Sequence, residues 1–75
     1  MRFVTRDGVP FDGATFTEAA EALRATSREP GRDLAEFMLG TARRAELQTG
    51  HHVRSAVAGD FLADIEAAGL IERLS

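Results

Sequence analysis

The sequence predicts a small α+β domain that is mostly helical, with an N-terminal β-hairpin followed by three helices. Three observations lead to this prediction. An Asp-Gly pair lies between two short runs of alternating apolar residues, as in a tight hairpin. Three later segments carry apolar residues at helical spacing, two of them behind capping motifs. The chain has 75 residues and no cysteine, so we expect one domain over 1–75 without disulfides.

Residues 1–13 form the predicted hairpin. With Asp7-Gly8 as a two-residue type I′ loop, Val4 faces Phe11 on the opposite strand. This register places Val4, Val9 and Phe11 on one face. Because an isolated hairpin is only marginally stable in water, we expect that face to lie on the helices.

We expect the first two helices over 15–27 and 33–49. Each begins with a capping box, in which a side-chain oxygen accepts from the backbone N–H three residues later. The pairs are Thr15 with Glu18, and Asp33 with Glu36.

The third helix is expected over 56–68, with Ser55 as its cap and Gly69 as the left-handed residue that ends it. The sequence does not decide the secondary structure of two segments. Residues 51–54 are either a loop or a strand that extends the hairpin, and the tail 70–74 is either coil or a last strand.

The predicted core combines the hairpin face with the apolar stripes of the helices. Its members are Val4, Phe11, Phe16, Leu23, Leu34, Phe37, Met38, Val57, Phe61, Ile65 and Leu70.

Composition excludes several functional classes. No apolar run approaches the ~20 residues of a membrane span, so we expect no membrane partner. Residues 1–8 are mixed and charged, unlike a signal peptide, so we expect a cytoplasmic protein. The net charge of −3 is concentrated toward the C-terminal half, opposite to the basic stripe typical of nucleic-acid binding.

Chemistry-bearing residues are few. His51 and His52 are the only histidines and no cysteine completes a four-ligand metal site. Asp60 and Asp64 lie one helical turn apart, a spacing that in most helices is simply a solvated face. We therefore expect no enzyme activity, no metal and no cofactor.

Two leucines of the second helix lie off its apolar stripe. At 100° per residue, Leu39 and Leu47 are roughly 120° and 160° from the centre of that stripe. Leu62 lies on the shoulder of the third helix. We predict that the three leucines form an apolar partner surface with Asp60 and Asp64 as a negative rim, although the hairpin or the tail could also cover them internally.

Residues 61–72 suggest a second hypothesis. This amphipathic helix, closing on Gly69 before Leu70-Ile71-Glu72, resembles the end of the recognition helix in winged-helix regulators. The resemblance implies a winged-helix-like shape and DNA binding. Arg43, Arg44 and Arg54, from the most basic stretch of the chain, would then be the phosphate contacts. The sequence departs from that family in one respect: its third helix is acidic, so the phosphates of DNA would repel it.

The leading hypothesis is therefore a small non-catalytic interaction or regulatory protein. It would act as a homo-oligomer or as an accessory subunit of a larger complex. The alternative is a winged-helix-like DNA-binding transcriptional regulator.

Overall fold

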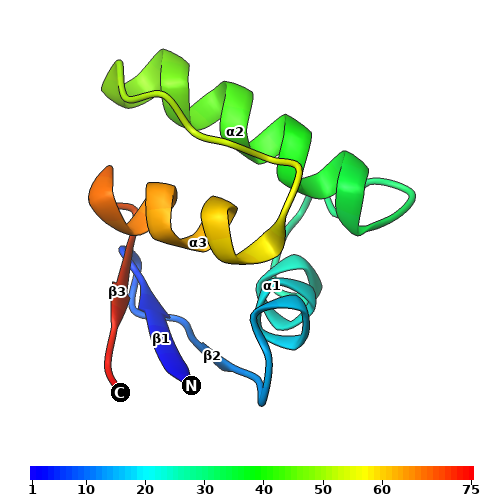
Figure 1. Ribbon diagram of the computed structural model, residues 1–75, viewed down its shortest axis with the longest axis vertical. Helices are drawn as coiled ribbons and strands as arrows, with labels where there is room; N and C mark the ends of the chain where they lie inside the picture. Colours follow the sequence, from blue (N-terminus) through cyan, green and yellow to red (C-terminus); the bar gives the residue numbers. More distant parts are fainter.

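The computed structural model describes residues 1–75 as three helices on a three-stranded antiparallel sheet (Figure 1). The strands are β1 (Arg2–Thr5), β2 (Pro10–Asp12) and β3 (Ile71–Arg73), in the order β2-β1-β3. The helices are α1 (Phe16–Ala25), α2 (Leu34–Thr49) and α3 (Ala58–Ala67). Helix α3 lies between the sheet and α2, and α1 packs beside it against β2 (Figure 1). The predicted α+β class and element order are confirmed.

The hairpin forms, but its predicted register is wrong by one residue. Phe3 pairs with Phe11, and Val4 pairs with Pro10. The Thr5 N–H donates to the Val9 carbonyl over 2.8 Å, which makes a three-residue loop that ends at Gly8, with φ 88°. Such a loop uses one left-handed residue where a type I′ turn needs two.

The shift exchanges the two faces of β1, because side chains alternate along a strand. Phe3 now points to the helices and stacks on Phe11, with ring centroids 5.1 Å apart. Val4, expected in the core, lies half-buried on the other face.

Both predicted N-terminal caps are confirmed. Thr15 Oγ1 accepts from the Glu18 N–H at 3.1 Å, and Asp33 Oδ1 accepts from the Glu36 N–H at 2.9 Å. Helix α3 differs, since it starts at Ala58 after Val57, which provides no side-chain cap. The prediction that Ser55 caps this helix is therefore wrong.

The C-terminal tail continues into the sheet. Gly69 has φ 82°, and the Leu70 N–H donates to the Ile65 carbonyl at 3.0 Å, the pattern of a Schellman ending. Strand β3 then pairs antiparallel with β1. Residues 51–54 belong to no strand; they lie in the coil 50–57 that runs back along α2 (Figure 1).

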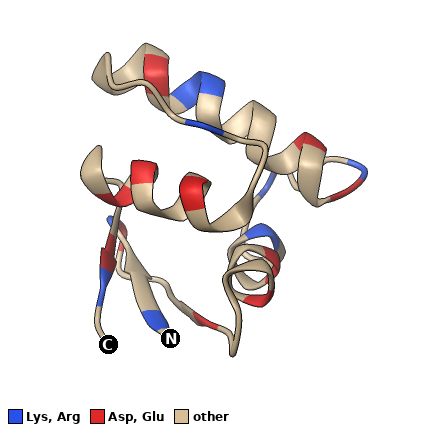
Figure 2. Ribbon diagram, viewed as in Figure 1, with Lys and Arg blue, Asp and Glu red and all other residues tan.

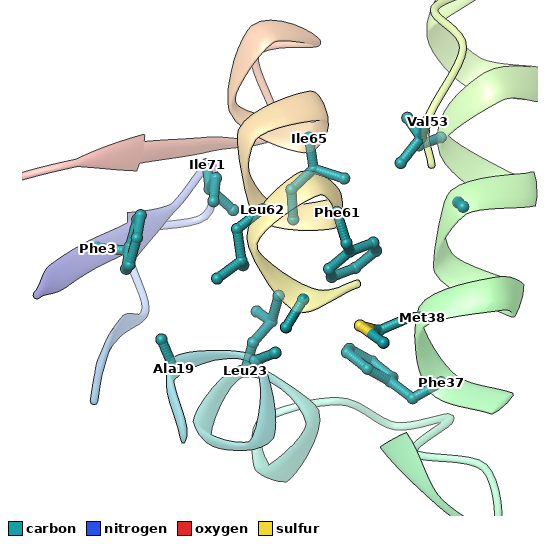
Figure 3. Packing of buried hydrophobic residues seen from close by; sticks show 14 of the residues in the cluster. Phe3, Ala19, Leu23, Phe37, Met38, Val53, Phe61, Leu62, Ile65 and Ile71 are labelled. Atoms are coloured by element: carbon teal, nitrogen blue, oxygen red, sulfur yellow. The ribbon is translucent and has the colours of Figure 1, made fainter. Parts of the chain in front are cut away.

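Fifteen buried residues, all apolar, form one core (Figure 3). Three predicted members differ: Val4 is half-buried, while Phe16 and Val57 are exposed at 41% and 59%. The predicted members Leu34 and Leu70 pack on the core while only partly buried. The buried residues are Phe3, Phe11, Ala19, Ala20, Leu23, Phe37, Met38, Ala42, Ala45, Val53, Ala58, Phe61, Leu62, Ile65 and Ile71.

Candidate protein interface

The outward face of α2 carries two uncovered leucines. Leu39 is 44% exposed and Leu47 is 88% exposed, in agreement with their predicted position off the buried stripe. Neither the hairpin nor the tail covers them, because both pack on the far side of α3 (Figure 1). Both leucines therefore lie on the outside of the domain.

Leu62 does not belong to this surface. It is 1% exposed and points from α3 toward the sheet side, whereas Phe61 points toward α2 (Figure 3). Helix α3 is covered on both sides, so its buried arc is wider than that of a helix on the outside of a domain. The prediction of Leu62 as a partner contact is wrong.

Arg43 lies midway between the two leucines. Residues four apart on a helix are neighbours on one face, so Leu39, Arg43 and Leu47 form a single stripe, which we call the α2 outer face. Arg43 is exposed and has no carboxylate within 4.0 Å. This face therefore combines two apolar side chains with Arg43. Two carboxylates border it, Glu36 and Glu46, which lie beside Arg32 and His52 respectively.

The other two candidate phosphate contacts are paired within the chain. Arg44 Nη1 lies 3.0 Å from Glu29 Oε2. Arg54 donates to Asp64 from its Nε at 2.8 Å, from its Nη2 at 3.0 Å and from its backbone N–H at 2.9 Å. Figure 2 shows positive and negative residues interspersed along the ribbon, with no element basic over its length.

Both acidic residues of α3, Asp60 and Asp64, form ion pairs with Arg54. Asp60 Oδ1 lies 3.4 Å from Arg54 Nη1, beside the stronger contact that Arg54 makes with Asp64. The guanidinium hydrogen bond, followed by the backbone N–H of Arg54, lowers the pKa of Asp64 to about 2. Asp64 therefore stays charged, but Arg54 already balances its charge. The negative rim predicted for a partner surface is correspondingly less negative.

The connection from α2 to α3 departs from a helix-turn-helix. That motif joins its helices by a turn of about three or four residues. Here the coil 50–57 leaves the end of α2 and returns along it, so that α2 and α3 lie side by side (Figure 1). The resemblance to winged-helix regulators is thus limited to α3, its glycine ending and the strand that follows.

Metal-binding side chains do not gather anywhere in the structure. No group of three or more His, Cys, Asp or Glu residues has the geometry to hold an ion. His52 Nδ1 lies 3.3 Å from Glu46 Oε2, and both side chains face solvent.

Comparisons with protein families, with curated proteins and with solved structures find no match to this chain. None of the three helices has both the length and the apolar character needed to cross a membrane.

Proposed function

We propose that this chain is a small non-catalytic interaction domain that associates with a second copy of itself through the α2 outer face. The observation that supports the proposal is Leu47, a large apolar side chain 88% exposed on the same face as Leu39. A second copy would bring its own two leucines opposite this pair, and the four side chains together would form a contiguous apolar contact of the kind typical of partner surfaces. A domain of this size also often gains stability by oligomerisation.

A two-fold pair of antiparallel α2 helices fits the spacing of the stripe. Leu39 and Leu47 are eight residues apart, or about 12 Å along the axis. In an antiparallel pair centred on Arg43, Leu39 of each copy faces Leu47 of the other, so the same contact forms twice.

The same arrangement brings the two copies of Arg43 together. Like charges at this distance oppose association, and so does the net charge of −3 on each chain, so we expect a weak pair that tightens when salt screens the repulsion. A contact based on opposite charges would respond to salt in the other direction.

Sedimentation velocity over a range of protein concentrations tests the proposal. We expect the parent to shift from monomer toward dimer as its concentration rises, and more so at high salt. Leu47→Ser should stay monomeric. Leu74→Ser is the control, because Leu74 is 50% exposed at the end of the sheet, away from α2.

Two results would contradict self-association. One is a parent that remains monomeric at every concentration, which would leave only a role as a subunit docking on a different protein. The other is an equal loss of dimer in Leu47→Ser and Leu74→Ser, which would mean a general effect of surface hydrophobicity.

DNA binding is the weaker proposal, because Arg43 is the sole candidate phosphate contact without a carboxylate partner. We expect no mobility shift of duplex DNA at low salt with roughly 10–100 µM protein, a range that covers ordinary non-specific binding. A shift that disappears in Arg43→Gln would support the DNA hypothesis instead.

A further inference from the structure

A hollow of about 230 Å³ opens between the end of α1, the middle of α2, and the segment where α3 turns into β3. Its apolar lining is made of core side chains from separate elements, four of which are labelled in Figure 3. An enclosed apolar cavity of about 150 Å³ holds a benzene ring. This hollow is open to solvent on one side, so it has room for a ring with a short substituent that stays partly uncovered. Its apolar residues are Leu23, Phe37, Ile65, Leu70 and Ile71.

Four of the residues that line the hollow carry hydroxyl groups. The hydroxyl oxygens of Thr5, Ser27 and Thr41 each accept a hydrogen bond, from the Val9 N–H, the Glu29 N–H and Arg44 Nη2 respectively. A hydroxyl that accepts keeps its own hydrogen free to donate. Thr26 is the exception, because it donates to the Leu23 carbonyl at 2.7 Å.

Arg44 adds a positive charge to the rim of the hollow. Its guanidinium is held by Thr41 and by Glu29, whose side chain is 71% exposed. Exposed ion pairs of this kind contribute little and exchange readily. An incoming anion can therefore share or replace Glu29 at Arg44, while Glu29 itself opposes the anion's approach.

We propose that this hollow binds a small carboxylic acid with a single compact apolar group, of the arylalkanoic acid class. The apolar group occupies the space over Leu23, Phe37 and Ile65. The carboxylate lies at the rim, where it accepts from Arg44 and from the free hydroxyls. The site shares no residue with the α2 outer face, and its Arg44 lies one helical turn before Leu47 on α2.

An NMR titration of the intact chain with 3-phenylpropionate tests this proposal. We expect saturable amide shifts centred on the lining residues and a dissociation constant of about 1 mM, reasonable for a ligand this small. The neutral amide of the same acid should bind about tenfold more weakly, because it cannot pair with the guanidinium.

Three variants test whether the charge of Arg44 contributes to binding of the acid, as opposed to a general effect of changing a surface charge. Arg44→Gln should weaken binding of the acid about tenfold and leave binding of the amide nearly unchanged. Glu29→Gln should strengthen binding of the acid, because it removes the competing carboxylate. Arg28→Gln is the matched control, since Arg28 is exposed next to Glu29 but does not line the hollow, and it should bind like the parent.

Several outcomes would overturn the proposal. These are shifts scattered outside the hollow, equal affinity for the acid and its amide, or equal effects of Arg44→Gln and Arg28→Gln. Binding of a tripeptide that ends in phenylalanine without binding of 3-phenylpropionate would also overturn it, since the occupant would then be a peptide end. Unchanged melting temperatures in the three variants would show that the fold is intact.

Discussion

At the scale of single residues, the side chain of Asp64 joins the coil before α3 to α3 itself. It accepts three hydrogen bonds from Arg54, one of them from the backbone, and its side chain is 18% exposed. These bonds fix the coil 50–57 to α3. Asp60 and Asp64 are therefore not two similar residues on a solvated helix face: Asp64 is largely covered and Asp60 is exposed.

We predict that Asp64→Asn lowers the free energy of unfolding by about 1–2 kcal/mol, because it removes the charge from a bidentate contact. Asp60→Asn, its matched control, should change it by no more than about 0.5 kcal/mol, since Asp60 makes one longer contact at 3.4 Å. Urea denaturation at neutral pH measures both. Equal effects would show that the Arg54 contact does not stabilise the fold.

The lowered pKa of Asp64 predicts a pH dependence of defined sign. The folded state has a pKa of about 2 where an ordinary aspartate has 3.8, so the folded state prefers the charged form. The stabilisation is complete above pH ~5 and is lost as the pH falls from there through about 2. The difference in melting temperature between parent and Asp64→Asn should narrow over that interval; a constant difference would contradict the assignment.

At the scale of the elements, the hairpin register decides which β1 side chain enters the core. Phe3 is 2% exposed and stacks on Phe11, so Phe3→Ala should cost about 3–5 kcal/mol. Val4→Ala should cost less than about 1.5 kcal/mol, because Val4 lies on the outer face. Thermal or urea unfolding compares the two. The register with the two-residue loop predicts the reverse order.

Features that depend on a few neighbouring residues could be predicted from the sequence. The Thr15 and Asp33 caps and the Gly69 ending involve bonds within five residues, and all are present. The hairpin register was missed because Asp7-Gly8 is compatible with two loop lengths, and core packing selects between them.

The start of α3 was missed for a different reason. The backbone N–H of Arg54 bonds to Asp64, ten residues later, and this bond helps to hold the coil before α3 extended. Ser55 is thus kept out of the cap position. A partner so far along the chain leaves no local signal.

At the scale of the whole molecule, the order of the layers, with α3 between the sheet and α2, explains which residues of the candidate site could be predicted. Helical angles alone placed Leu39 and Leu47 outside the core, and both are exposed. Leu62 was assigned wrongly because its burial follows from the position of α3 between the sheet and α2, a tertiary property. The hollow was not predicted at all, since its lining comes from segments far apart in the chain.

Disulfide trapping at position 43 tests the central claim, self-association through α2, most directly. The chain has no cysteine, so Arg43→Cys provides one thiol at the proposed two-fold axis. A disulfide needs Cβ atoms about 4 Å apart, which the antiparallel pair allows there. We predict a covalent dimer of Arg43→Cys on mild oxidation, while Thr17→Cys, exposed on α1, stays largely monomeric. Equal trapping of both variants, or trapping of neither, would contradict the account.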